Sequence, residues 1–365
     1  MNEIWQPRYS ISPQLAQWLM DIESARQVVA HTILPPAVEA ELRQRARIRA
    51  THYSTRIEGN RLTLEQAEQV IQEKGVAIQG RERDVREVRN YWNALLRVED
   101  WVAQGKPLTE DLIRRLHSLV EYGVRAKATP YRDGQNVIRD SISGGIVYLP
   151  PEAKDVPALM AGLVSWVNQA EKNNIPIPLI AGLAHYQFVT IHPYYDGNGR
   201  TARLLSTFLL HRGGYGLNGF FSLEEYHARE LDDYYGALAV YPDHNYYEGR
   251  ADADLTTWLV YFLGLLTSVF RAAKEEALRL KDTPTNLEPE VLRNLDHRAR
   301  VVLGLFTSQN TITATQVAKA LGLSERMARN LMQDWVTQGW LLIANESRRK
   351  RAYELSAVYR QYIGR

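Results

Sequence analysis

Apolar residues along this chain repeat at the spacing of an α-helix over most of its length, and no other feature constrains the fold as strongly. In residues 81–102, for example, Val85, Val88 and Leu95 fall on one side of a helix. The same pattern predicts further helices over residues 37–58, 63–74, 108–122, 156–170, 179–191, 198–212, 223–239 and 251–276. We therefore expect a mainly α-helical protein.

One segment, between residues 131 and 151, departs from this pattern. Its glycines Gly134, Gly144 and Gly145 separate short β-prone runs at residues 136–138 and 146–149. Short β-prone runs bounded by glycine are typical of a β-hairpin. The sequence therefore predicts a hairpin on a helical body.

Composition excludes several classes of protein. The 365 residues include no cysteine, which excludes disulfide frameworks, thiolate zinc sites and thiol nucleophiles. Basic residues number 44 and acidic residues 42, so global charge indicates no nucleic-acid coat. The first ten residues lack the pattern of a signal peptide. The longest apolar run, residues 255–270, is shorter than the roughly 20 residues of a membrane span. We expect that run to be a buried helix, and the protein to be cytoplasmic and not membrane-bound.

Composition changes after residue 280. Residues 281–290 hold two prolines and polar residues without periodicity, which predicts a linker over 281–297. Beyond it, the patterns predict helices over 298–307, 313–321 and 324–338, and strands over 340–343 and 352–355. From residue 290 onward there are 12 Lys or Arg and 6 Asp or Glu, a net charge of +6. Because the whole chain carries +2, the remainder carries −4.

The most informative segment is IHPYYDGNGRTARLL, residues 191–205, which runs into an apolar-periodic helix. Its polar and glycine positions are His192, Asp196, Gly197, Asn198, Gly199, Arg200 and Arg203. Glycine lets the backbone approach a ligand closely, and the amides and dipole of the following helix attract an anion. Arg200 and Arg203 are three residues apart, so they can clamp oxygens of one polyphosphate. Asp196 offers the hard oxygen that Mg²⁺ prefers, and His192 can accept a proton from an attacking hydroxyl.

The run HPYYDGNGRTAR, residues 192–203, closely resembles the signature of the Fic family, H-P-F-x-D/E-G-N-G-R-x-x-R, with Tyr194 in place of phenylalanine. The segments PYRDGQNVI, GGIVYLPP and LDDYYGAL, and the run from Leu179, also resemble Fic-core segments in the usual order, although Arg139 stands where we expect glycine. The resemblance covers roughly residues 108–270. It implies a Fic-type helical bundle with a β-hairpin flap over residues 107–280, an amino-terminal helical region over 1–106, and a separate domain over 298–365.

The resemblance implies a protein adenylyltransferase that moves AMP from ATP to a Ser, Thr or Tyr hydroxyl of a target protein or of itself. His192 would be the general base and Asp196 the Mg²⁺ ligand. The residues implied to contact ATP are Gly197, Asn198, Gly199, Arg200 and Arg203 at its phosphates, and Tyr234, Tyr235 and Asn245 at its adenosine. The residues of the implied target-docking flap, which would align the target by strand addition, are Ile146, Val147, Tyr148, Leu149 and Pro150. Relatives that transfer phosphate or phosphocholine commonly alter the GNGR run, which is intact here. A homodimer is also implied.

The run STRIEG, residues 54–59, matches the inhibitory motif S/T-x-x-x-E-G/N, which begins here with Ser54 and precedes the core in one class of this family. Glu58 falls in the last turn before Gly59, where its charge opposes the helix dipole by about 0.3–1 kcal/mol. A positively charged partner would offset this unfavourable interaction. The resemblance implies that Glu58 pairs with Arg203 and withholds it from the γ-phosphate. In some relatives the same glutamate positions a water that removes AMP, and the sequence leaves that activity open.

The carboxyl-terminal segment, residues 298–365, resembles a winged helix-turn-helix. Thr313 and Gln316 would begin its first helix, Gly322 would make the turn, Ser324 would cap the second helix, and the RRKR run at 348–351 would form the tip of a wing. Winged helices contact duplex DNA through its phosphates, and others bind proteins, so DNA is one candidate partner of residues 298–365. A second hypothesis for the chain is thus a DNA-binding transcriptional regulator that uses its Fic core as a nucleotide sensor.

Overall fold

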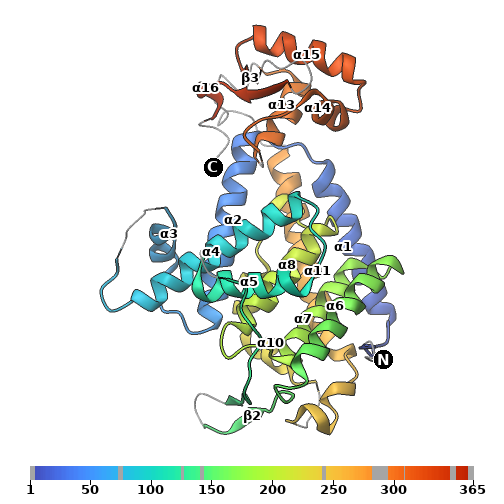
Figure 1. Ribbon diagram of the computed structural model, residues 1–365. Helices are drawn as coiled ribbons and strands as arrows, with labels where there is room; N and C mark the ends of the chain where they lie inside the picture. Colours follow the sequence, from blue (N-terminus) through green and yellow to red (C-terminus); the bar gives the residue numbers. More distant parts are fainter. Residues whose placement is uncertain are drawn as a thin grey trace. The chain divides into compact units, whose positions relative to one another are not determined.

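The computed structural model describes residues 5–72, 77–124, 127–139, 144–240, 244–281, 295–307, 309–345 and 351–360. Along these residues the chain is mostly helical, with two antiparallel pairs of short strands (Figure 1). It divides into two compact units, the first Met1–Ala30 with Ala46–Lys274 and the second His31–Arg45 with Glu275–Arg365. Three of the long helices therefore contribute residues to both units, one of them only its last residue.

The first unit holds the helices that precede and form the predicted core. They are α1 (Pro13–His31), the end of α2 (Pro36–Ile57), α3 (Leu64–Gln72), α4 (Glu82–Ala103), α5 (Glu110–Tyr122), α6 (Val156–Lys172), α7 (Ile177–Ile191), α8 (Asn198–Arg212), α9 (Leu223–Arg229), α10 (Leu231–Leu238) and most of α11 (Thr256–Lys281), with the 3-10 turns η1 (Leu217–Gly219), η2 (Tyr246–Glu248) and η3 (Arg250–Asp252). The helices predicted between residues 37 and 212 are confirmed to within a few residues, whereas α1 is an addition. The capping box at Thr63 and Gln66 forms both of its hydrogen bonds.

Helices α7 and α8 form the centre of this unit (Figure 1). Nearly every residue of α7 is buried, as expected for a helix whose sequence is apolar on all sides apart from a few polar residues. Gly182 lets α11 come close, because a Cβ there would lie 2.7 Å from the ring of Phe262. Trp258 of α11 also donates a hydrogen bond of 2.7 Å to the Gly182 carbonyl. The core packing therefore fixes the end of α7 and the start of α8, between which the predicted signature loop lies.

Helix α11 contains residues 256–270 of the apolar run predicted to be a buried helix. By length and composition it could cross a membrane, with a mean hydropathy of 1.3 over the 18-residue window, of which 56% is buried in this structure. Its residues Leu259, Phe262, Leu263 and Leu266 are fully buried against the rest of the first unit. The predicted buried helix is therefore present as a core element. It begins at Thr256 rather than at the predicted residue 251, and residues 250–252 form η3 instead.

The helix predicted over residues 223–239 is wrong as a single element. The chain leaves the helical conformation at Glu230, with φ −116° and ψ 47°, and this residue separates α9 from α10. The side chain of Ser222 caps α9 by accepting a hydrogen bond from the Glu225 amide. No glycine or proline marks the break, so local sequence does not indicate it. Lys74 and Gly75, the predicted end of the helix over 63–74, lie outside the described residues.

The predicted hairpin is confirmed. Strand β1 (Ile138–Arg139) pairs antiparallel with β2 (Ile146–Tyr148), with Ile138 opposite Tyr148. Tyr148 is buried, and its hydroxyl donates to the carbonyl of Thr190 in α7 at 2.8 Å. Ile146 and Val147 are 51% and 42% exposed. The hairpin is thus anchored at one end beside α7 and presents apolar side chains to solvent.

The second unit contains the elements predicted for residues 298–365. They are α13 (His297–Leu303), η5 (Gly304–Thr307), α14 (Ala314–Leu321), α15 (Glu325–Thr337), the antiparallel strands β3 (Leu341–Asn345) and β4 (Ala352–Leu355), and α16 (Ala357–Arg360). Its core includes Trp335 and Trp340, whose ring centroids are 5.0 Å apart. Thr313 forms the predicted capping box, and Ser324 caps α15. Residues 282–294 of the predicted linker and 348–350 of the predicted wing tip lie outside the described residues.

Candidate active site

The loop between α7 and α8 holds the predicted signature. His192 takes a left-handed conformation, with φ +51°, and this turns the chain out of α7. Asn198 then forms two hydrogen bonds with the backbone of Tyr194: its Oδ1 accepts from the amide at 3.0 Å, and its Nδ2 donates to the carbonyl at 2.8 Å. The Asn198 side chain is thus committed to the shape of the loop. Gly197, with φ +74°, leads directly into α8.

The imidazole of His192 is partly buried at the end of α7. Its Nδ1 lies 3.3 Å from the carbonyl oxygen of Val189, so a proton on Nδ1 leaves Nε2 as the acceptor. Burial, assisted by the charge of Arg132, lowers the pKa of His192 to about 4. The ring is therefore neutral near pH 7 and can accept a proton.

Arg132, which sequence reasoning did not single out, braces this loop. Its Nε donates to the carbonyl of His192 and its backbone amide to that of Pro193, both at 2.9 Å. Its two terminal nitrogens donate to the carbonyls of Gly134, at 3.0 Å, and of Pro151. The residue is only 3% exposed. One guanidinium therefore connects the histidine loop to the end of the hairpin.

The carboxylate of Asp196 is the predicted Mg²⁺ ligand, and its side chain is 59% exposed. Its Oδ1 accepts a hydrogen bond from the Gly197 amide at 2.6 Å, and its Oδ2 lies 3.5 Å from Nη2 of Arg83. An accessible carboxylate oxygen fits Mg²⁺. Among the described residues, no group of three or more His, Asp or Glu could hold a metal ion. The donor set therefore suits an ion that takes its other ligands from water and substrate phosphates.

The predicted ion pair between Glu58 and Arg203 is present. Nη2 of Arg203 lies 2.9 Å from Oε1 of Glu58 and donates at 2.8 Å to the carbonyl of Ser54, while Nε donates at 2.8 Å to the Ser54 hydroxyl. A Cβ on Gly199 would lie 2.3 Å from Oε1 of Glu58, so this carboxylate rests on the backbone at the start of α8. The first amides of a helix lack intrahelical partners and attract anions. Glu58 therefore occupies a position suited to a phosphate.

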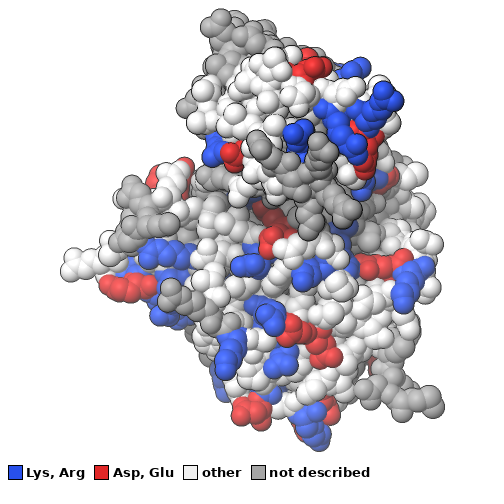
Figure 2. Space-filling view, turned by 45° about the horizontal axis from the view of Figure 1, so that its top comes forward, with Lys and Arg blue, Asp and Glu red and all other residues white. Residues whose placement is uncertain are grey.

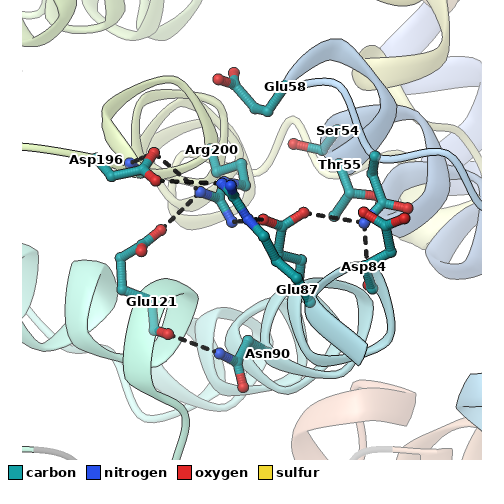
Figure 3. A network of polar contacts seen from close by, with 12 residues as sticks. Ser54, Thr55, Glu58, Asp84, Glu87, Asn90, Glu121, Asp196 and Arg200 are labelled. Atoms are coloured by element: carbon teal, nitrogen blue, oxygen red, sulfur yellow. Dashed lines mark hydrogen bonds and ion pairs between the residues drawn. The ribbon is translucent and has the colours of Figure 1, made fainter. Parts of the chain in front are cut away.

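Arg200 is held by a different set of carboxylates (Figure 3). Its Nη2 lies 2.7 Å from Oε1 of Glu121 and 3.3 Å from Oδ1 of Asp196, and its Nη1 lies 4.0 Å from Oε1 of Glu87. The guanidinium is 2% exposed. Arg200 and Arg203, predicted to clamp one polyphosphate together, are thus each paired with carboxylates in this structure, and their role toward phosphate stays a prediction. The carboxylates come from α4, α5 and the loop, so helix spacing in the sequence could not indicate them.

A polar network connects the inhibitory motif to these carboxylates. Asn60 donates from Nδ2 to Oε2 of Glu87 and to the carbonyl of Asp84, both at 3.0 Å. Oε1 of Glu87 accepts a hydrogen bond of 2.8 Å from Nε of Arg83, whose Nη2 approaches Asp196. The segment that carries Glu58 and the residues around Arg200 therefore share one set of contacts, part of which is visible in Figure 3.

The three residues implied to contact adenosine differ in exposure. Tyr234 is 2% exposed, and its hydroxyl lies 2.9 Å from Nε2 of His185, which leaves little of its surface for a ligand. Tyr235 is 49% exposed. The Asn245 side chain accepts a hydrogen bond from the Tyr247 amide and donates one to Glu248, so it caps η2. Of the two tyrosines, Tyr235 therefore offers the more accessible ring.

The base of the hairpin lies beside this segment. The amide of Leu149 donates to the carbonyl of His244 at 2.6 Å, and the amide of Tyr246 donates to the carbonyl of Leu149 at 3.0 Å. Pro150 is buried, and its carbonyl accepts a hydrogen bond from Gln135. The hairpin, the histidine loop and the segment around Asn245 are therefore brought together around one site.

Comparisons with known proteins agree with this geometry. Protein adenylyltransferase Fic of Drosophila grimshawi is 30% identical over 198 residues, which cover 54% of this chain and 40% of that protein. The protein of the same name from Drosophila mojavensis is 33% identical over 165 residues, which cover 45% and 32%. The chain therefore spans less than half the length of these relatives.

Solved structures match over more of the chain. The crystal structure of a Fic family protein from Desulfovibrio desulfuricans G20 has a TM-score of 0.60 and 26% identity, and the match covers 97% of this chain and 99% of that one. A Fic domain containing signaling protein from Bacteroides thetaiotaomicron VPI-5482 shares the fold, with a TM-score of 0.59 over 73% of this chain and 97% of that one, at 24% identity. Residues 107–210, which include the loop, His192 and both arginines, match the sequence model of the Fic/DOC family. This chain therefore carries a Fic/DOC domain.

Proposed function

We propose that this protein is an adenylyltransferase that moves AMP from ATP to a hydroxyl side chain of a protein, and that Glu58 restrains it. The observation that carries the proposal is the convergence of a neutral histidine, an accessible carboxylate and an anion-attracting helix start within the residues that match the Fic/DOC family. The names of the relatives support the same activity.

In the proposed reaction, the target hydroxyl oxygen attacks the α-phosphorus of ATP. A bond forms between these two atoms, the bond from the α-phosphorus to the bridging oxygen breaks, and diphosphate leaves. His192 accepts the hydroxyl proton on Nε2, which its bond to Val189 leaves available. When bound at Asp196, Mg²⁺ would offset the negative charge that builds on the departing diphosphate.

The amides at the start of α8, with Arg200 and Arg203, are the groups proposed to bind the phosphates. Gly197 and Gly199 let a ligand approach this backbone, and Tyr235 is the proposed contact for adenine. Glu58 restrains the reaction because its carboxylate rests on Gly199 and pairs with Arg203. Removal of AMP by a water that Glu58 positions is a further proposed activity of the same residue.

ATP labelled at the α-phosphate tests the activity. We expect the Glu58→Gly variant to label a protein, itself included, more than the wild type does, and the His192→Ala change in that background to abolish the label. Equal labelling by the variants with and without His192 would refute the proposed role of this base. Mass spectrometry of a lysate treated with Glu58→Gly protein would identify the target and the modified residue type.

The exposed apolar side chains of the hairpin support a role in docking that target. Ile146 and Val147 lie on β2, whose short pairing with β1 suits the addition of an extended peptide as a further strand. Backbone pairing of this kind carries little side-chain information, so it suits more than one target sequence.

We further propose that residues 298–365 form a winged helix that binds duplex DNA. The order α13, α14, α15, β3, β4 and the exposed side chains of Arg326, Arg329 and Asn330 on α15 support it. Figure 2 shows Lys and Arg side chains gathered on part of the surface of this unit. Fluorescence anisotropy with a labelled duplex should detect binding that weakens as salt rises and is reduced by Arg326→Ala, whereas Arg97→Ala on α4 leaves it unchanged. Binding that ignores salt and Arg326 would exclude this surface.

A cytoplasmic homodimer is the proposed state of the protein, on the grounds of a chain without cysteine and of the family resemblance. Light scattering of the purified chain measures its mass in solution and so tests the dimer.

A further inference from the structure

Each of the two arginines at the start of α8 has a carboxylate of its own from another element. Arg203 pairs with Glu58, which directly follows α2, at 2.9 Å, and Arg200 pairs with Glu121 of α5 at 2.7 Å. Both guanidinium groups are 2% exposed. The inhibitory motif accounts for the first pair, whereas no motif in the sequence accounts for the second.

Glu121 is fitted closely between the loop and Arg200 (Figure 3). A Cβ on Gly197 would lie 2.5 Å from Oε1 of Glu121, so this carboxylate rests on the backbone of Gly197 as that of Glu58 rests on Gly199. The Glu121 side chain is 17% exposed. Two carboxylates therefore lie against the two glycines at the start of α8.

The surroundings of Glu121 are unfavourable for its charge. Burial raises the pKa of Glu121, and the carboxylates of Asp196 and Glu87 raise it further, while Arg200 acts in the opposite direction. Glu87 is itself bonded to Arg83 and Asn60 and lies 4.0 Å from Arg200. Asp196 lies 3.3 Å from Arg200 and is 59% exposed, whereas Glu121, at 2.7 Å and 17% exposed, is the nearest carboxylate partner of that arginine. Buried ion pairs of this kind often contribute little to stability. A role in binding explains the placement better than a role in folding.

We propose that Glu121 is a second restraint on nucleotide binding, which occupies Arg200 as Glu58 occupies Arg203. The inference rests on the proposed function, because it takes Arg200 as a phosphate-binding residue. A phosphate that reaches Arg200 must displace the Glu121 carboxylate or share the guanidinium with it. The apparent affinity of the protein for ATP is then the intrinsic affinity multiplied by the fraction of molecules in which Arg200 is available to phosphate.

Two consequences distinguish this arrangement from a purely structural pair. Removing the Glu121 charge should strengthen binding of ATP, whose phosphates need Arg200, and leave binding of adenosine unchanged. If Glu121 instead only held Arg200 in place for the nucleotide, the same change would weaken ATP binding.

Isothermal titration calorimetry on the full-length chain tests the proposal, with the His192→Ala change present throughout to prevent turnover. Four proteins are compared: one with no further change, one with Glu58→Gly, one with Glu121→Gln, and one with both of these substitutions. We expect Glu121→Gln to lower the Kd for ATP by about fivefold or more in each background, with no change for adenosine. The matched control is Asp111→Asn, which removes an exposed carboxylate from the same helix.

An unchanged or higher Kd for ATP in Glu121→Gln would overturn the proposal, as would the absence of ATP binding in every variant. If Glu121→Gln lowers the thermal midpoint by several degrees, Glu121→Asp provides the second variant, because its shorter side chain withdraws the carboxylate from Arg200. A Glu58→Gly protein that binds ATP but labels no protein would refute the transferase proposal alone. The role of Glu121 would then still be decided by the ratio of the ATP affinities.

Discussion

Replacing Glu58 with glycine should activate AMP transfer, and the structure allows the size of the effect to be worked out. The change removes the 2.9 Å contact between the Glu58 carboxylate and the Arg203 guanidinium. The Arg203 side chain is 2% exposed and the Glu58 side chain is 28% exposed. A hydrogen bond to a charged group contributes about 1.5–3 kcal/mol. Since about 1.4 kcal/mol corresponds to a tenfold change, Arg203 becomes available to phosphate about 10- to 100-fold more often.

The same change should cost the fold little. Glu58 lies beyond the last residue of α2, so glycine there does not interrupt the helix. A carboxylate at that end opposes the helix dipole by about 0.3–1 kcal/mol, and its loss offsets part of the lost ion pair. Arg203 also keeps both of its hydrogen bonds to Ser54. We therefore expect a thermal midpoint within a few degrees of the wild type.

The assay is the initial rate of label transfer from ATP labelled at the α-phosphate, at ATP concentrations below saturation. Glu58→Gln, which keeps the size of the side chain but not its charge, should fall between the wild type and Glu58→Gly. Glu65→Gly, at an exposed glutamate in the first turn of α3, serves as the control and should match the wild type. Equal rates for the wild type and Glu58→Gly, with both proteins folded, would refute the reasoning.

Two further predictions concern Arg132 and the buried histidines. Arg132→Gln removes the group that holds the His192 carbonyl and a charge that helps to lower the His192 pKa. In the Glu58→Gly background, AMP transfer should therefore slow by about tenfold or more, and the acid limb of its pH–rate profile should move to higher pH. An acid limb that does not move would mean that Arg132 only supports the fold. Burial lowers the pKa of His117 to about 4 and of His227 to about 3, below the value near 6.5 of an unfolded chain. Between about pH 4 and pH 6.5 the unfolded chain therefore binds more protons than the folded one. The stability that these residues contribute is full above about pH 6.5 and is lost as the pH falls toward 4. Urea denaturation should give a lower free energy of unfolding at pH 5 than at pH 7, by about 1 kcal/mol or more for each histidine. Equal free energies at the two pH values would contradict the burial argument.

Local patterns were sufficient to predict most of the elements. Apolar spacing and caps located the helices from α2 to α8, because each depends on residues three or four apart. The capping boxes at Thr63 and Thr313 are local features of the same kind, since both partners of each lie within one turn. The break at Glu230 was missed because no local breaker marks it. The first helix, α1, also escaped prediction.

The placement of His192, Asp196, Arg200 and Arg203 in one loop and helix start could likewise be predicted, because they are neighbours in the sequence, and their chemical roles stay a proposal. The contact of Arg203 with Glu58 is different, since 145 residues separate the two. A family resemblance supplied that pair, whereas the spacing of residues within either segment carries no information about it.

What the sequence by itself determined, then, is a mainly helical chain with a hairpin, a charged loop before a helix and a distinct carboxyl-terminal segment. Only the tertiary structure decided that Glu121 lies on Arg200, that Arg132 braces the His192 loop and that Tyr234 is turned into the core. The physical reason is that periodicity specifies which face of a helix is buried but not which other helix it meets. Polar contacts between α4, α5 and the loop exist only once their apolar faces have packed.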